Sequence, residues 1–166
     1  MLVFGLLEVA RAMYVVNTLH EVTRRAAALA ANSGFDQASQ DEVRRKALFP
    51  DADGNLILGR PITPSHLRID YMSLARDASS GTLTPVPMSA MPSCPAKNKI
   101  NCVADPYSPS CIRLVQVRIC QPGTDCTRVP YEMLFPLVNL PFLLPRAETI
   151  TAAQTMGYTL GSIPCP

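Results

Sequence analysis

This sequence contains no tryptophan, only two histidines, and none of the short motifs that mark common enzymes. It has no G-x-S-x-G nucleophile motif, no H-E-x-x-H metal motif and no glycine-rich phosphate loop. His20 lies among basic residues and His66 beside a proline-rich turn, so we expect solvent-facing or capping roles for both. The formal net charge of +2 gives no electrostatic reason to bind nucleic acid. We therefore expect neither catalysis, nor a cofactor, nor a nucleic-acid partner.

The sequence also lacks an apolar run long enough for a comfortable membrane span, although its beginning is strongly apolar. A span needs about 20 apolar residues, whereas residues 1–16, MLVFGLLEVARAMYVV, include the charged Glu8 and Arg11. The basic leading region and small-residue cleavage site of a secretory signal are missing. Two explanations fit: the chain begins inside a longer apolar helix, or this segment is a buried core element.

Residues 1–31 are predicted to form one helix that begins apolar, ends basic and stops at Gly34. Glu8 and Arg11 are spaced to share a helix face and form an ion pair. Either the helix packs on the protein's own sheet, or it packs among neighbouring subunits, or each holds over a different half. The residues that follow helical spacing on one side are Leu6, Val9, Met13, Val16, Thr23, Ala27 and Ala30.

Six cysteines, all in the second half of the chain, predict up to three disulfides and an oxidising compartment. Fifteen pairings are possible for six cysteines. Local spacing favours Cys120 with Cys126 around a Pro-Gly turn, and Cys94 with Cys102 around Pro95, which leaves Cys111 with Cys165. No C-x2-C spacing indicates zinc. The sixteen prolines favour extended edges and ordered loops.

The middle of the chain predicts a short helix over residues 36–48 and a plain turn over 51–55. That turn, D-x-D-G-N, resembles the start of a calcium loop but lacks the glutamate at the twelfth position. A half-buried strand is predicted over residues 67–72, because Leu67, Ile69 and Tyr71 alternate with polar residues. Residues 81–109, rich in proline, are expected to be a long exposed loop pinned by disulfides.

Two further strands are predicted to form a hairpin around the Pro-Gly turn. Residues 112–119 alternate clearly, and residues 129–135 alternate again after the turn. Because an isolated hairpin is only marginally stable, the strand near Tyr71 should join it. The expected fold is α+β: a long N-terminal helix packed on a small antiparallel sheet.

The N-terminal helix resembles that of the TadE-like proteins, minor pseudopilins of the Tad (Flp, type IV) pilus. The shared pattern is an apolar run, G-[ILV]-[ILV]-E-x-[AG]-R, an aromatic residue and an Arg- and Ala-rich end. It appears here as GLLEVAR at residues 5–11, Tyr14, and TRR at residues 23–25. The segment YEMLFPLVNLPFLLPRAETITAAQTMGY at residues 131–158 is similar to the family's C-terminal region. Together the two regions cover about a third of the chain.

The resemblance implies a pilin-like structural protein rather than an enzyme. Residues 1–34 would be the later part of a membrane and filament stem, and residues 35–166 a disulfide-containing globular domain. The domain would lie in the periplasm with the stem in the bacterial inner membrane, and then on a cell-surface pilus used in adhesion. Expected partners are other minor pilins and the major pilin. The expected helix assembly interface comprises Leu6, Glu8, Arg11, Met13, Tyr14, Arg24 and Arg25.

The chain departs from the family at the processing site. Such proteins are expected to be cut at a glycine that precedes a glutamate at a set spacing, and Gly5 has no glutamate at that spacing. We therefore expect the processing site and the first part of the helix upstream of Met1. The alternative function is a membrane-tethered binding or adhesion module that acts alone through residues 81–109.

Overall fold

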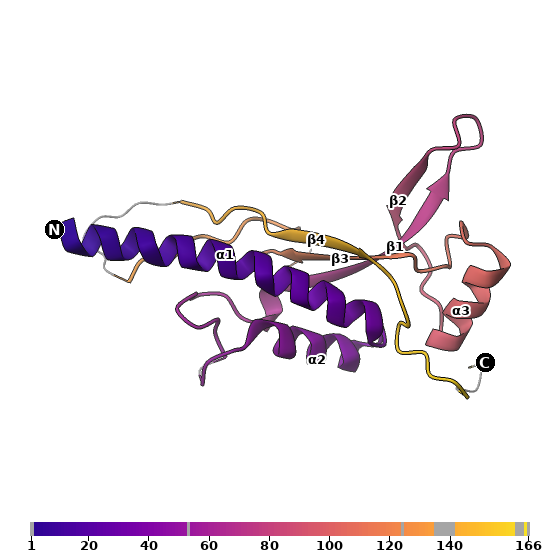
Figure 1. Ribbon diagram of the computed structural model, residues 1–166, viewed down its shortest axis with the longest axis horizontal. Coiled ribbons are helices and arrows are strands. Elements are labelled where there is room, and N and C mark those ends of the chain that lie inside the picture. Colours follow the sequence, from indigo (N-terminus) through magenta and orange to yellow (C-terminus); the bar gives the residue numbers. More distant parts are fainter. Residues whose placement is uncertain (1, 53, 124, 135–141, 162–164, 166) are drawn as a thin grey trace.

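The computed structural model describes residues 2–52, 54–123, 125–134, 142–161 and 165, which form an α+β arrangement. A long N-terminal helix packs on a four-stranded antiparallel sheet (Figure 1). The predicted fold class and the predicted packing of helix on sheet are both confirmed.

The helices of the first half follow the sequence prediction closely. Helix α1 runs without a break over Leu2–Asn32, and α2 covers Gln37–Leu48. Asp36 caps α2, because its side chain accepts a hydrogen bond from the Ser39 N–H. A 3-10 turn, Pro64–His66, leads into the sheet, and its His66 Nδ1 accepts from the Thr63 N–H, a capping role as predicted.

The two strands at the centre of the sheet come from distant parts of the sequence. Strand β1, Leu67–Arg76, pairs with β3, Leu114–Ile119, as expected for the strand near Tyr71. Strand β2, Leu83–Pro87, lies on the far side of β1, and β4, Glu148–Ala152, lies on the far side of β3.

The predicted hairpin between residues 112–119 and 129–135 is wrong. Both edges of β3 are occupied, one by β1 and the other by β4. The alternating residues Val129 and Tyr131 are buried, but the described part of their segment forms only an isolated bridge, Pro130 with Leu143. The β-branched run of β4 takes the place beside β3, which Pro130 could not fill without losing a ladder donor.

The proline-rich region 81–109 is more ordered than predicted. It contains β2 and a third helix, α3, Pro95–Ala104, which starts with proline at a position where a missing N–H costs nothing.

Helix α3 also explains how the cysteines pair. The pairs are Cys94–Cys165, Cys102–Cys111 and Cys120–Cys126.

Of the three favoured disulfide pairs, only Cys120–Cys126 is confirmed. The expected Cys94–Cys102 and Cys111–Cys165 pairs are wrong. Cys94 caps α3 and Cys102 lies in it, so about 12 Å of helix rise separates them. A disulfide spans a Cα–Cα distance of only about 4.4–6.8 Å. Cys94 therefore bonds to the C-terminal segment instead, with the two Cα atoms 6.1 Å apart.

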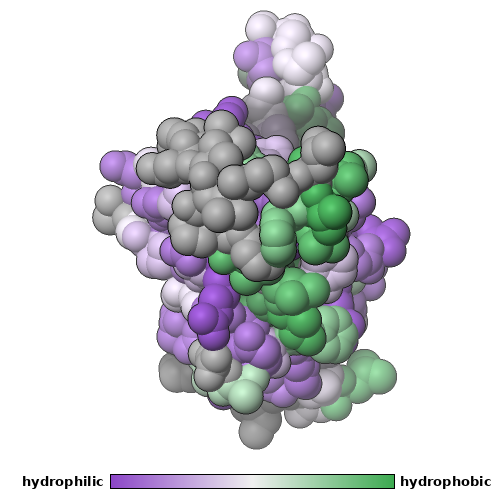
Figure 2. Space-filling view, turned by 90° about the vertical axis from the view of Figure 1, so that its left-hand side faces the viewer, coloured by the Kyte–Doolittle hydropathy of each residue, from purple (hydrophilic) through white to green (hydrophobic). Residues whose placement is uncertain are grey.

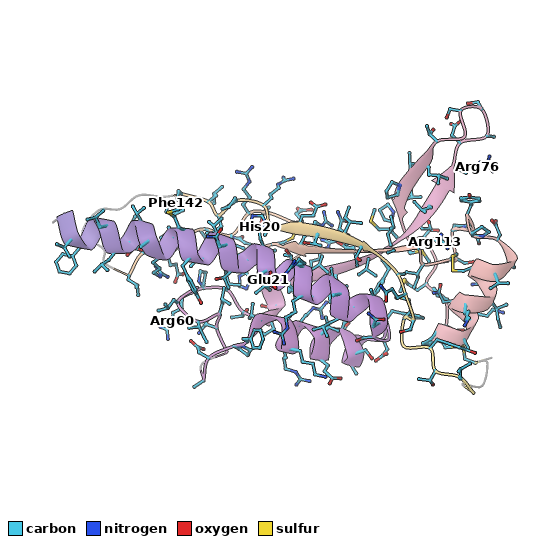
Figure 3. All side chains as sticks on the ribbon, viewed as in Figure 1. His20, Glu21, Arg60, Arg76, Arg113 and Phe142 are labelled. Carbon is cyan, nitrogen blue, oxygen red and sulfur yellow. A yellow bond between two sulfur atoms is a disulfide. The ribbon has the colours of Figure 1, made fainter. Side chains whose placement is uncertain are left out.

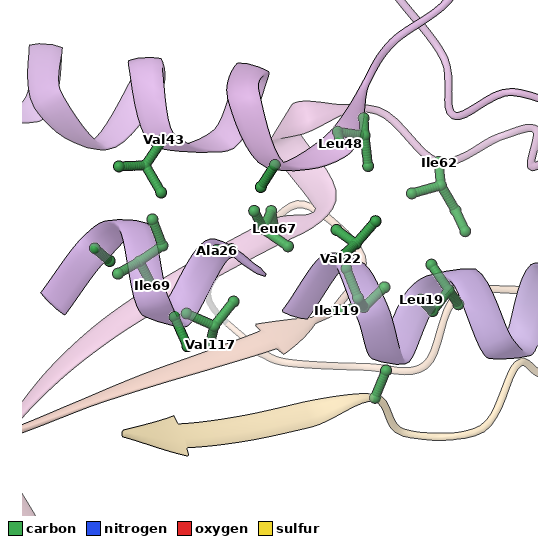
Figure 4. Close-up of a cluster of buried hydrophobic side chains, with 14 of the residues drawn as sticks. Leu19, Val22, Ala26, Val43, Leu48, Ile62, Leu67, Ile69, Val117 and Ile119 are labelled. Carbon is green, nitrogen blue, oxygen red and sulfur yellow. The ribbon is translucent and has the colours of Figure 1, made fainter. Parts of the chain in front are cut away.

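The core lies where the second half of α1 meets both α2 and the sheet. Figure 4 shows α1 between α2 and strands β3 and β4, with Leu19, Val22 and Ala26 among the buried side chains. The Thr149 hydroxyl of β4 donates to the Thr23 hydroxyl of α1 over 3.0 Å. Small alanines at positions 26, 27, 30 and 31 let the neighbouring elements approach α1 closely, and all four are buried.

The segment after β4 satisfies the carbonyl groups at the end of α1. The N–H groups of Gln154 and Met156 both donate to the Ala31 carbonyl, and the Gly157 N–H donates to the Asn32 carbonyl. Gly157 has φ of 77°, and a Cβ there would lie 2.7 Å from the Gly34 nitrogen. The end of α1 is therefore held by a segment more than 120 residues away in sequence.

Candidate interaction surface at the start of helix α1

The first half of α1 presents a row of large apolar side chains to solvent. Leu6, Val9 and Met13 are 70%, 59% and 63% exposed. Figure 2 looks at the end of the molecule where α1 begins and shows apolar side chains gathered there, beside polar surface. We call the exposed residues Val3, Leu6, Leu7, Val9 and Met13 the stem surface. Contiguous exposed apolar surface is typical of sites that contact another protein, a ligand or a membrane.

Between these apolar residues, a polar cluster faces the protein's own chain. Glu8 and Arg11 form the predicted ion pair over 3.0 Å, and Arg11 is buried although it is charged. Arg11 Nη1 also donates to the Tyr131 hydroxyl over 3.1 Å and to the Glu132 carbonyl over 2.7 Å. Its guanidinium carbon lies 4.9 Å from the centroid of the Tyr131 ring.

Two further contacts complete this polar cluster. Arg11 Nε donates to the Leu58 carbonyl over 2.8 Å. The Glu8 Oε1 atom accepts from the Tyr131 hydroxyl over 2.8 Å and from the Leu134 N–H over 3.3 Å. A charge removed from water is costly unless it is paired and hydrogen-bonded, and this arrangement meets both conditions. Two distant loops are thereby fastened to one turn of α1.

The pKa values follow from these contacts. Burial alone would raise the pKa of Glu8, but hydrogen bonds from Tyr131, from the Leu134 N–H and from Arg11, together with the Arg11 charge, lower it below 4.5 overall. Burial, and then the hydrogen bond to Glu8, raise the pKa of Tyr131 to about 12. Glu8 is therefore a carboxylate and Tyr131 a neutral donor at neutral pH. Within the described residues, Glu8 Oε2 is buried without a hydrogen-bond partner.

The remaining residues of the expected assembly interface lie apart from this cluster. Tyr14 is 44% exposed and continues the row of the stem surface. Arg24 is exposed and pairs with Glu21 over 3.1 Å. The Arg25 guanidinium lies 3.7 Å from the ring centroid of Phe49, the residue that ends α2 in a left-handed conformation. Leu6, Met13 and Tyr14 thus face outward, whereas Glu8 and Arg11 turn toward their own chain.

In the part of the chain that the structure describes, no group of three or more His, Cys, Asp or Glu side chains is placed to hold a metal ion. The predicted turn at residues 51–55 is present, with the Gly54 N–H bonded to the Asp51 carbonyl. His20 is exposed on α1, as predicted.

Sequence reasoning missed the partners of Glu8 and Arg11. Tyr131, Leu58 and Leu134 lie far along the chain from α1, and no local spacing links them to it. The available signal was indirect: a charged pair inside an apolar run requires partners, and a buried tyrosine requires one for its hydroxyl.

Comparison with protein-family models, curated proteins and solved structures found no match to this chain. No helix among the described residues is long and apolar enough to cross a lipid bilayer.

Proposed function

We propose that this protein is a TadE-like minor pilin, a structural subunit that contributes to the initiation, assembly or tip of a Tad-type pilus. In this proposal its α1 stem packs against the helices of neighbouring pilins. The globular part stands in the periplasm while the stem is at the inner membrane, and it reaches the cell surface with the fibre. The protein works by association, and no reaction is assigned to it.

One observation carries the proposal: a single helix is buried in its second half and exposed and apolar in its first. A helix that served only its own domain would turn its largest apolar residues inward. Here Leu6 is 70% exposed, whereas the smaller Ala26 and Ala30 are fully buried. The resemblance of residues 5–31 to TadE-like stems supports the same conclusion independently of the packing.

The apolar and the charged residues of α1 would have different roles in assembly. Apolar side chains of the stem surface would bury against neighbouring helices, which stabilises association by about 25 cal/mol per Å² of apolar area. Glu8 and Arg11 would keep the stem at a set position relative to its own domain. Arg24 and Arg25 lie farther along α1 and remain accessible for charge pairs that set the register between subunits.

The test changes the stem surface without touching the polar cluster. Leu6→Asp and Val9→Asp are introduced together in the native cells, and sheared fibres are probed for this protein by mass spectrometry and immunoblot. We expect the double variant to accumulate at normal levels but to disappear from the fibre fraction, and the fibres to become fewer. Reading the N-terminal peptide in the same material locates any segment upstream of Met1.

A matched control places the same charges on another exposed apolar surface. Ile100 and Val103 of α3 are 49% and 78% exposed, so Ile100→Asp with Val103→Asp should leave fibre incorporation unchanged. If the stem variant enters fibres as well as the wild type does, or if the wild type is never found with fibres or partner pilins, the pilin proposal is wrong.

A second candidate function, the adhesion module expected to act through residues 81–109, rests on the β1–β2 arm, because β2 belongs to that region. The arm projects away from the body of the protein in Figure 1, and its tip, residues 77–83, is exposed throughout. A solitary tethered adhesion module would use such an arm to reach a ligand. Shortening the arm to a two-residue turn separates the two ideas: loss of surface attachment with normal fibres favours the adhesion module, whereas normal attachment rejects it.

A further inference from the structure

Exposed apolar side chains also occur on two loop segments beside the first half of α1. Ile57 and Leu58 are 50% and 58% exposed on one of them. Leu134, Phe142 and Leu143 are exposed on the region that follows Tyr131. We call Ile57, Leu58, Leu134, Phe142 and Leu143 the collar. None of its members carries a charge, and each belongs to a segment far from α1 in sequence.

The polar cluster, Glu8, Arg11 and Tyr131, is bonded to both loop segments of the collar. Arg11 Nε binds the Leu58 carbonyl, and the Leu134 N–H binds Glu8. Tyr131 stacks on the Phe142 ring, with centroids 4.4 Å apart, and its N–H donates to the Phe142 carbonyl over 3.0 Å. The charges of the cluster thus turn inward, and the apolar tips that it fastens remain outside.

One member of the collar is also held in an unfavourable backbone conformation. Leu58 has φ of 56°, a left-handed backbone conformation that residues other than Gly, Asn and Asp rarely adopt. Glycine or asparagine would satisfy the turn at lower cost, yet the position carries an exposed leucine. Strain of this kind is concentrated at functional positions. An apolar contact made by Leu58 would account for both its exposure and its conformation.

The distribution of the collar favours a planar partner over a helical one. In Figure 3, Arg60 and Phe142 lie on opposite sides of α1, so the two loop segments flank the helix from different directions. One neighbouring helix would cover a single stripe of α1, whereas a planar apolar medium meets all sides at the same level. Arg60 and Arg146, both exposed, follow the apolar tips in sequence and suit a layer of anionic headgroups. The exposed carboxylate of Glu132 lies near the same apolar tips and carries the opposite charge to these two arginines.

We propose that the collar inserts into the interfacial layer of an anionic lipid bilayer around the stem. This inference rests on the proposed function, because it describes the subunit at the membrane before assembly. The collar then fixes the domain against the bilayer surface at the level of Glu8 and Arg11, so that its orientation relative to the membrane is restricted. The bilayer supplies an apolar contact for Leu58 and its neighbours, and phosphate groups for the adjacent arginines.

Since the chain contains no tryptophan, single tryptophans can report the depth of each site. The full chain, purified in detergent, is reconstituted with phosphatidylethanolamine–phosphatidylglycerol vesicles whose acyl chains are brominated. Ile57→Trp and Leu143→Trp probe the two loop segments, Val9→Trp probes the stem, and Val103→Trp on α3 is the matched control. We expect blue-shifted, strongly quenched emission from the two collar variants and from V9W, and unshifted, unquenched emission from V103W.

The outcomes distinguish the collar from the stem. Quenching of V9W without quenching of I57W and L143W would leave the stem at the membrane and overturn the collar. Absence of quenching in all variants would overturn the collar together with the membrane stage of the proposed function. Equal quenching of V103W would also overturn the proposal, because the contact would not be confined to the collar.

A variant that removes one apolar tip measures its contribution to binding. Leu58→Asn suits the left-handed conformation, so the loop should keep its fold, which thermal unfolding checks. Loss of one inserted leucine should weaken partition into vesicles about tenfold. Unchanged partition of L58N, with the Val103→Asn control also unchanged, would count against a bilayer contact at Leu58.

Discussion

The two halves of α1 belong to one uninterrupted helix, but they meet different surroundings. Residues 15–31 are packed between α2 and the sheet, and Val15, Leu19 and Val22 are buried there. Residues 3–14 carry larger apolar side chains that remain mostly exposed. In this protein, hydrophobicity alone does not decide burial, because the position of the sheet relative to the helix does. The apolar half without a sheet is the half available to a partner.

The polar cluster marks the boundary between the two halves. Arg11 is the last charged residue before the buried half. Its hydrogen bonds to the Leu58 and Glu132 carbonyls connect α1 to two loops that are distant in sequence. A charged residue within an apolar run could indicate a membrane interface or a subunit contact. The contacts show a third role, in which the charge fastens the helix to its own domain.

The largest effect should come from removing a buried leucine in the second half. Leu19 is fully buried, so Leu19→Ala should lower the free energy of unfolding by about 3–5 kcal/mol. Leu6→Ala, the same change in the exposed half, should lie within about 0.5 kcal/mol of the wild type. Urea unfolding followed by circular dichroism measures both. Similar losses for the two variants would mean that the first half is also packed in the folded monomer.

A smaller effect should follow from breaking the polar cluster. Arg11→Met leaves Glu8 largely buried without its cation and should cost about 2–3 kcal/mol of folding free energy. Arg24→Met is the matched control, because Arg24 pairs with Glu21 on the exposed surface and should contribute less than about 1 kcal/mol. Denaturant unfolding of both variants tests this order. An Arg11→Met variant as stable as R24M would show that the cluster does not fasten the loops.

The smallest effect concerns pH. Because the pKa of Glu8 is lower in the folded protein than its ordinary value of 4.5, the unfolded chain binds more protons near that pH. The contribution of Glu8 is therefore present above about pH 4.5 and is lost as the pH falls through the folded pKa. Glu8→Gln should therefore reduce the acid sensitivity of the melting temperature. Identical melting profiles of E8Q and the wild type between pH 3 and pH 7, allowing a uniform offset, would contradict this.

Local pattern was sufficient for the elements whose signal lies within a few residues. The helix of residues 2–32 follows from the helical spacing of its residues, and α2 follows from the order of its charges, acidic before basic. Strands β1 and β3 follow from the alternation of apolar and polar residues. The i,i+3 spacing was enough to pair Glu8 with Arg11. The Cys120–Cys126 disulfide follows from a six-residue separation around a turn.

Tertiary structure alone decided the partners that lie far apart in sequence. Alternation predicted a strand at residues 129–135, but β3 pairs with β4, and the part of the predicted strand beyond Leu134 lies outside the described residues. Helix α3 separates Cys94 from Cys102 and so redirects the former to Cys165. Local periodicity determines which residues can share a face. Which faces meet, and which stay open at the start of α1, depends on how the whole chain closes around its core.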